Sequence, residues 1–309
     1  FPAVLFLPGT TNIITASPAP LPQTPEIMTQ RLQILKPATR LISPAYIRYL
    51  FQNDRFAETR DLLNQNSSPP NADIQPVCYT YAFIIWLSKF FPRLALIDAS
   101  SAAHNFFFNP PLSLLFWIGL PLLFLLSRLN SMLRRVLLVA FAGFIGMVLE
   151  TILMLYDQVK EGVLYQDVGL LLMSFMAGLT LGALIINRIM AGTSKKQSDF
   201  RWYGAGLLTG FCMLCAFMAG KVFMDASTCL FLIALLLVCN GFLVAGIFAY
   251  ASLHETDDQQ KLISPLYAAD LIGGCAGSLL GSLMFIPLAG MDITTLVMLF
   301  LAAFSVMLL

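Results

Sequence analysis

The sequence contains few charged residues. They make up 11% of its 309 residues, against 58% hydrophobic residues, whereas water-soluble domains carry about 25% charged residues. The mean hydropathy is +0.78. A surface this poor in charge excludes nucleic acid as a partner, because such binding depends on clustered lysine and arginine. The composition indicates a membrane protein whose main surroundings are the lipid bilayer.

Side chains that bind metals and haem are also scarce. Five of the six cysteines lie in apolar runs, where a thiol acts as a small apolar side chain. Cys212 and Cys215 form a CxxC pair, but it lies in an apolar run and has no further ligand nearby. The only histidines, His104 and His254, lie near the edges of predicted spans. We therefore predict no metal site and no cofactor.

Long apolar runs follow from about residue 110 onward, separated by short polar gaps. Each run is long enough to cross about 30 Å of hydrocarbon at about 1.5 Å per residue. The fold class is thus mainly α, a polytopic helical membrane bundle of about seven spans with a small N-terminal α/β domain. The predicted spans are roughly 110–128, 135–156, 166–189, 202–223, 228–252, 265–288 and 292–309.

Basic residues gather in alternate gaps between these runs. Because lysine and arginine favour the cytoplasmic side, the first, third and fifth gaps are predicted to face the cytoplasm of a prokaryotic inner membrane. With seven spans, the domain before them lies on the non-cytoplasmic side. The basic residues of those gaps are Arg128, Arg134 and Arg135, then Arg188, Lys195, Lys196 and Arg201, then Lys261.

Residues 1–98 have the character of a separate domain, and residues 99–309 form the membrane domain. Two apolar runs around Pro8-Gly9 predict a β-hairpin, and helices are expected near 26–35, 44–52 and 55–65. The chain begins without methionine, and we expect further residues upstream of Phe1.

The run 79–91 is apolar and aromatic but short and charged at its end. We interpret it as an interfacial helix, because its aromatic residues suit the headgroup zone. If it crossed the membrane instead, the first domain would lie in the cytoplasm.

A repeat is visible in the membrane domain. Asp167 precedes or opens a span that carries Gly178 and Gly182, and Asp270 opens one that carries Gly277 and Gly281. These are the middle spans of two units of three, so the units must have opposite topology. Inverted three-plus-three repeats are typical of transporter halves.

Four ionisable residues inside or near the spans are candidates for function: Glu150, Asp270, Asp167 and Lys221. A carboxylate at the depth of Glu150 costs several kcal/mol unless it is paired, protonated or wet. It is either a proton or cation site or a protonated group that fixes packing. Asp270 and Asp167 are either functional or structural caps, and Lys221 is expected to extend to the headgroups.

Small residues recur at four-residue spacing in two spans. This pattern favours close helix packing, with a hinge as the alternative. The packing glycines are Gly178, Gly182, Gly273, Gly277 and Gly281.

The stretch Asn71-Ala-Asp73-Ile-Gln-Pro76-Val-Cys-Tyr79 resembles the Asn-Thr-Asp-x-x-Pro-Val-x-Tyr motif of membrane-bound spermidine synthase-like proteins, with Ala72 in place of the usual threonine. Glu150, the 167–182 stretch and the 267–273 stretch resemble motifs of that family's transporter-like membrane domain. The resemblance implies the tail of an aminopropyltransferase-like α/β domain followed by a helical bundle.

The resemblance does not carry enzymatic activity to this chain. Residues 1–98 contain no glycine-rich turn between a strand and a helix, which a dinucleotide-like site needs. The cofactor-binding glycines and the catalytic aspartate of the family would lie upstream of Phe1. We predict no catalytic residue in the chain.

Three functions remain open at this point. The first is a non-catalytic scaffold or accessory subunit that docks other membrane-complex subunits. The second is half of a transporter for a small cation or polyamine, which would need a partner or a homodimer. The third is a membrane-attached aminopropyltransferase whose catalytic half lies upstream.

Overall fold

The structure is a computed structural model. It describes residues 3–9, 12–21, 24–35, 42–65, 71–93, 119, 130–162, 165–192, 197–224, 229–253 and 259–308. The first predicted span, 110–128, lies outside the described residues apart from Gly119, as do His104 and His254. The chain divides into two compact units, Phe1–Pro69 and Pro70–Leu309.

The first unit combines a hairpin with three helices. Strands β1 (Ala3–Leu7) and β2 (Ile13–Ser17) pair antiparallel, with Ala3 opposite Ser17. Helix α2 begins after Ser43, whose side chain accepts a hydrogen bond from the Tyr46 N–H at 3.2 Å, as an N-cap does. The predicted hairpin and the three predicted helices are confirmed, since the helices are α1 (Pro25–Leu35), α2 (Pro44–Gln52) and α3 (Asp54–Gln65).

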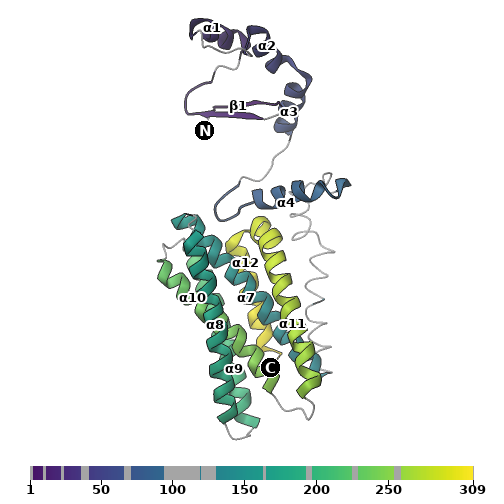
Figure 1. The fold of residues 1–309 in the computed structure, drawn as a ribbon, viewed down its shortest axis with the longest axis vertical. Coiled ribbons are helices and arrows are strands. Elements are labelled where there is room, and N and C mark those ends of the chain that lie inside the picture. The colour runs from purple at the N-terminus through teal and green to yellow at the C-terminus, as the bar shows by residue number, and fades with distance from the viewer. Residues whose placement is uncertain are drawn as a thin grey trace. The chain divides into compact units, whose positions relative to one another are not determined.

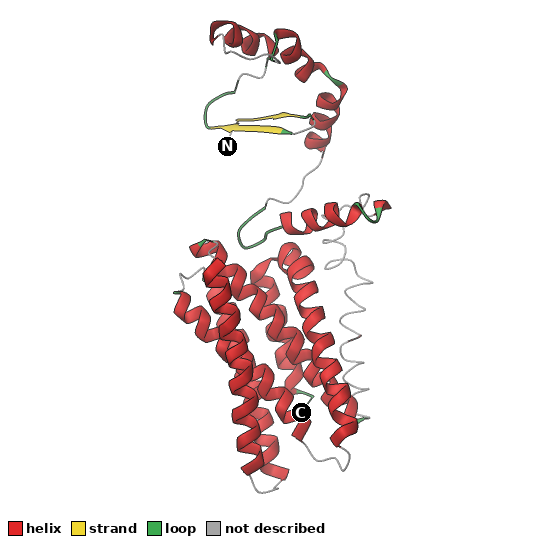
Figure 2. Ribbon diagram, viewed as in Figure 1, coloured by secondary structure: helices red, strands yellow, loops and turns green. Residues whose placement is uncertain are grey.

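The second unit consists of helices (Figures 1 and 2). The short helix α4 (Cys78–Ser88) falls in the run predicted to form an interfacial helix. Its 11 residues extend about 16 Å, too short to cross a bilayer. The long helices are α7 (Ser131–Glu161), α8 (Tyr165–Gly192), α9 (Gln197–Phe223), α10 (Leu230–Leu253), α11 (Gln259–Leu280) with the π-helix η2 (Gly281–Ala289), and α12 (Gly290–Val306).

Five helical stretches are long and apolar enough to cross a membrane, which makes this a multi-pass membrane protein. The fifth stretch, Ile263–Val306, has 44 residues, about twice the length that one crossing needs. Gly290 interrupts it with a φ of 90°, a left-handed value that glycine adopts without strain. The break falls in the gap predicted between residues 288 and 292.

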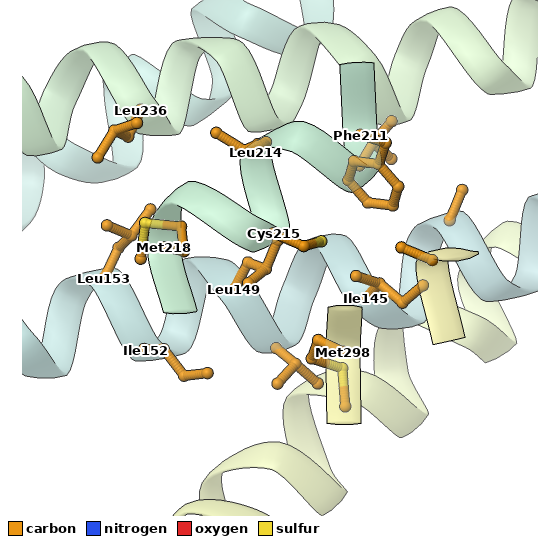
Figure 3. Close-up of a cluster of buried hydrophobic side chains, with 14 of the residues drawn as sticks. Ile145, Leu149, Ile152, Leu153, Phe211, Leu214, Cys215, Met218, Leu236 and Met298 are labelled. Atoms are coloured by element: carbon orange, nitrogen blue, oxygen red, sulfur yellow. The ribbon is translucent and has the colours of Figure 1, made fainter. Parts of the chain in front are cut away.

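The bundle core surrounds α7. Ile145, Leu149 and Ile152 on α7 are fully buried, and Figure 3 shows them beside side chains from α9, α10 and α12. Cys215 of the CxxC pair lies in this core among apolar side chains (Figure 3), where its thiol packs as a small apolar group.

Four helix pairs build the rest of the bundle. Helix α8 packs along α10, and α11 packs along α7. Helix α9 packs against α12, and α7 also packs against α10. Each of α7, α8 and α9 therefore has its main partner among α10, α11 and α12.

Glycines bring two of these pairs into backbone contact. A Cβ on Gly178 or Gly182 of α8 would overlap the backbone of Val238 or Phe242 of α10. A Cβ on Gly273 or Gly277 of α11 would likewise overlap the Ala140 or Phe144 backbone of α7, and Gly281 lies against the Val148 side chain. These five glycines therefore pack helices closely, as small residues do in membranes.

We expect Gly273→Ala and Gly178→Ala each to lower the free energy of unfolding by about 1–3 kcal/mol, because the new methyl group forces a tightly packed helix pair apart. Gly206→Ala on α9 is the control, since nothing lies within 4 Å of a Cβ there and alanine favours a helix by about 1 kcal/mol. Thermal unfolding in detergent measures the difference. Equal midpoints for all three variants would contradict the packing role.

Candidate functional site

Glu150 lies at the wall of a pocket inside the membrane domain. Its side chain is only 6% exposed, and its Oε2 has no hydrogen-bond partner among the residues that the structure describes. The pocket has a volume of about 350 Å³. Its lining comes from α4, α7, α8, α11, η2 and the segment before α4. The carboxylate therefore faces a space in which a small ligand can bind.

Hydroxyl groups accompany Glu150 in the same pocket. Thr151 donates its hydroxyl hydrogen to the Met147 carbonyl at 2.8 Å, and Ser282 donates to the Ser278 carbonyl at 2.7 Å. Since each hydroxyl uses its hydrogen in this way, its oxygen lone pairs remain able to accept or to coordinate. The pocket thus combines one carboxylate with neutral oxygen ligands, and most of its remaining lining is apolar.

A second pocket, of about 470 Å³, contains Asp270. It shares the wall residues Met147 and Ser278 with the first pocket, so the two adjoin along α7 and α11. Asp270 is half-buried and lies against Gly143. A Cβ added to Gly143 would be 3.0 Å from the Asp270 Oδ1. No ion pair within the described part of the chain includes Asp270.

The segment Asn71–Thr80 closes one side of the Glu150 pocket, with Pro76 and Tyr79 in its lining. Gln75 Nε2 donates to the Leu288 carbonyl at 2.7 Å, and Thr80 Oγ1 donates to the Leu283 carbonyl at 2.9 Å. The Met291 N–H in turn donates to the Ile74 carbonyl at 2.9 Å. Three hydrogen bonds therefore join this segment to the η2–α12 junction.

These bonds satisfy backbone groups that a broken helix leaves open. Pro287 has no N–H, so it cannot donate the hydrogen bond that a residue of the π-helix η2 normally makes to the carbonyl five residues earlier. Leu288 and Met291 lie at the end of η2 and the start of α12, where carbonyls and N–H groups lack helical partners. The segment stabilises the break because it supplies those partners.

The residues of the Asn71 motif shape this segment. Asn71 Oδ1 accepts a hydrogen bond from the Cys78 N–H at 3.0 Å. Pro76 is buried against the pocket, while Asp73 is exposed. Asn71 and Pro76 are therefore positioning residues of the docking segment, and Asp73 has no contact with the pocket.

The remaining predicted residues lie elsewhere. Asp167 is half-buried in the first turn of α8 and lines neither pocket. Lys221 lies near the end of α9 with its Nζ 5.9 Å from the centre of the Phe217 ring, a cation–π contact. The structure brings Glu150 and Asp270 into adjoining pockets and does not bring Asp167 or Lys221 to either.

Sequence reasoning missed two buried polar residues next to this region. Asn240 of α10 is fully buried and donates to the Gly146 carbonyl at 2.8 Å, while its Oδ1 has no partner in the described residues. Asp157 of α7 is 2% exposed, and its Oδ1 is likewise unpartnered there. Spacing offered a signal for Asp157, since it lies seven residues after Glu150 and thus on nearly the same helix face.

Comparisons with protein-family models, with curated proteins and with solved structures give no match. The resemblance to membrane-bound spermidine synthase-like proteins therefore stays a prediction. The described residues also contain no group of three or more His, Cys, Asp or Glu that could hold a metal ion.

We expect Thr80→Val to destabilise the docking of α4 by about 1 kcal/mol, because it removes the hydrogen bond that the Thr80 hydroxyl donates to the partly buried Leu283 carbonyl. Hydrogen exchange of the α4 amides should become faster. Thr209→Val is the control, since the Thr209 hydroxyl is exposed and bonds only carbonyls of its own helix. Unchanged exchange in Thr80→Val would mean that this bond does not hold the segment.

Proposed function

We propose that this protein is a membrane transport subunit that exchanges an alkali cation for a proton at Glu150. The observation that carries the proposal is a buried carboxylate in the wall of a pocket, one oxygen of which has no hydrogen-bond partner among the described residues. In a low-dielectric setting a lone carboxylate is costly, so it binds either a proton or a cation. A carboxylate that always holds either a proton or a cation releases the proton when the cation binds, and releases the cation when the proton binds.

The oxygen ligands of the pocket suit an alkali cation. Hard cations favour carboxylate, carbonyl and hydroxyl oxygens, and the pocket offers Glu150 with Thr151, Ser278 and Ser282. One carboxylate balances one positive charge, which favours a monovalent ion over a divalent one.

An inverted repeat supports transport. In such a repeat α7, α8 and α9 correspond to α10, α11 and α12. The α8–α10 pair then corresponds to the α11–α7 pair, and the α9–α12 and α7–α10 pairs each correspond to themselves, as the observed packing requires. Two three-helix units related in this way are a common plan of transporters, with the binding site at their interface. Glu150 belongs to α7, in the first group of three helices, and Ser282 belongs to η2, in the second group.

The glycine contacts support the same repeat in detail. Gly178 and Gly182 meet α10 as Gly273 and Gly277 meet α7. A Cβ on Gly241 would overlap the Phe175 carbonyl, and one on Gly143 would meet the Asp270 carbonyl. In this register Gly178 corresponds to Gly273 and Phe175 to Asp270. It differs from the register expected from sequence, in which Asp167 corresponds to Asp270.

The broken helix beside the site also favours transport. Transporter sites are commonly formed where a span is discontinuous, because the break frees backbone groups and allows movement. Here the π-helix η2, Pro287 and Gly290 interrupt the chain next to the pocket. A π-helix is rare and often marks a functional site.

The topology is part of the proposal. A turn at Gly290 makes two crossings of the stretch Ile263–Val306, so the described residues cross six times. The seventh crossing is the one predicted from the sequence over 110–128. The basic gaps then lie in the cytoplasm of a prokaryotic inner membrane. The beginning of α7, with Arg134 and Arg135, lies on the cytoplasmic side, and the turn between α7 and α8 lies on the other.

We expect Glu150→Gln to abolish ²²Na⁺ uptake driven by a pH gradient in proteoliposomes, because glutamine can exchange neither proton nor cation. ⁸⁶Rb⁺ uptake in parallel shows which alkali ion is preferred. Glu58→Gln is the control, since it makes the same chemical change at an exposed position of α3. Wild-type uptake in Glu150→Gln would refute the proposal.

The scaffold remains a second candidate, and one observation favours it. The first unit exposes large apolar side chains, among them Ile34 at 78% and Leu35 at 75%, and such exposure in a small unit marks a protein contact. No observation on the described residues favours the aminopropyltransferase alternative.

If the scaffold function holds, a membrane subunit should co-purify at fixed stoichiometry. Its retention should fall at least tenfold in Ile34→Lys/Leu35→Lys, because charges in a buried apolar contact are costly. Native mass spectrometry of the detergent-solubilised protein measures this. A solitary chain in both the wild type and the variant would count against a scaffold.

A further inference from the structure

Asp157 has the same combination of burial and missing partner as Glu150. It is 2% exposed, and its Oδ1 has no hydrogen-bond partner among the described residues. It follows Glu150 by seven residues on α7, which is about 10 Å along the helix and nearly the same face. The two carboxylates therefore lie in one line along the helix.

The Glu150 pocket extends toward Asp157. Its lining follows α7 from Met147 through Thr151 and Leu155 to Gln158, the neighbour of Asp157. Asp157 itself is not part of that lining, so the pocket ends at the helical turn next to its buried carboxyl group.

The charges that act on Asp157 are negative. Asp167, in the first turn of α8, and Glu161, one turn further along α7, interact with it electrostatically. The nearest lysine in sequence, Lys160, has its Nζ 5.9 Å from the centre of the Tyr156 ring. The three carboxylates outnumber Lys160 at the α7–α8 turn, and the net negative charge concentrates cations there.

We propose that Asp157 is a second cation-binding carboxylate, through which an alkali cation passes between the acidic α7–α8 turn and Glu150. The identity of the cation rests on the proposed function, but the site itself rests on the geometry of Asp157. Asp167 lines neither pocket, but as part of the acidic α7–α8 turn it attracts cations toward Asp157.

The route continues on the other side of Glu150. Asp270 lies against Gly143, which precedes Glu150 by seven residues, and its pocket adjoins that of Glu150. Asp157 and Glu150 on α7, and Asp270 of α11 beside Gly143, therefore follow one face of α7 at intervals of about 10 Å. The adjoining pockets join Glu150 to Asp270, and the proposed step between Asp157 and Glu150 runs along the same face.

The test uses the full chain in liposomes and a hydrophobic carbodiimide, which modifies carboxyl groups that lie in apolar surroundings. Mass spectrometry measures the modification of Asp157 with and without Na⁺, in the wild type and in Glu150→Gln. We expect Asp157 to be modified in both proteins and Na⁺ to protect it in both. Absence of modification, or modification that Na⁺ does not reduce, would overturn the proposal.

Transport kinetics give an independent measurement. We expect Asp157→Asn to raise the Na⁺ concentration for half-maximal uptake about tenfold, since it removes the charge that attracts and holds the entering ion, while Na⁺ still protects Glu150. Asp61→Asn is the control, because Asp61 is an exposed aspartate of α3. Wild-type kinetics in Asp157→Asn would also overturn the proposal.

The two proposals fail in different ways. Uptake that persists in Glu150→Gln refutes exchange at Glu150, whereas Na⁺ protection of Asp157 in that same variant still supports the Asp157 site. Loss of Na⁺ protection at Asp157 refutes the second site even where Glu150 is required for uptake.

Discussion

Close backbone contact between α7 and α11, and between α8 and α10, is the constraint on which the membrane domain depends. Apolar side chains alone cannot hold helices together in lipid, since lipid tails offer equally good contacts. Glycines remove the side chain at each crossing, so that helix backbones touch. Because α11 is fixed so closely to α7, Asp270, Ser278 and Ser282 face the same side of α7 that carries Glu150. The pockets are a consequence of this packing.

The second structural theme is the interrupted helix and the segment that completes it. Pro287 and Gly290 interrupt the path from α11 to α12, and the open carbonyls would be costly in a membrane without donors. Gln75 and Thr80 donate to the Leu288 and Leu283 carbonyls of η2, and the Ile74 carbonyl accepts from the Met291 N–H. The same segment contributes Pro76 and Tyr79 to the Glu150 pocket. Stability of the break and access to the carboxylate thus depend on one set of residues, which couples α4 to the site.

Much of the fold follows from local pattern. The hairpin, α1 to α3 and the long helices from α7 onward match the predicted ranges, because turn residues, caps and apolar run length act over short distances. The contact boundary between units falls at Pro69 and Pro70, whereas composition placed it near residue 98. Composition could not show that α4 packs on η2, since that contact joins residues about two hundred positions apart. The sequence could not predict which residues of the two repeats correspond through the glycine contacts for the same reason.

The sequence by itself determined that the chain crosses a membrane several times, that Glu150 is an ionisable group inside a span, and that glycines mark close helix contacts. These properties depend on residue type and short spacing. Only the tertiary structure decided that Glu150 lies in the wall of a pocket and that Asp270 lies in the adjoining pocket. It also decided that Asp157 is buried with one oxygen unpartnered among the described residues. Whether a buried carboxylate is paired depends on the helices packed around it, and the sequence near the carboxylate does not record which helices those are.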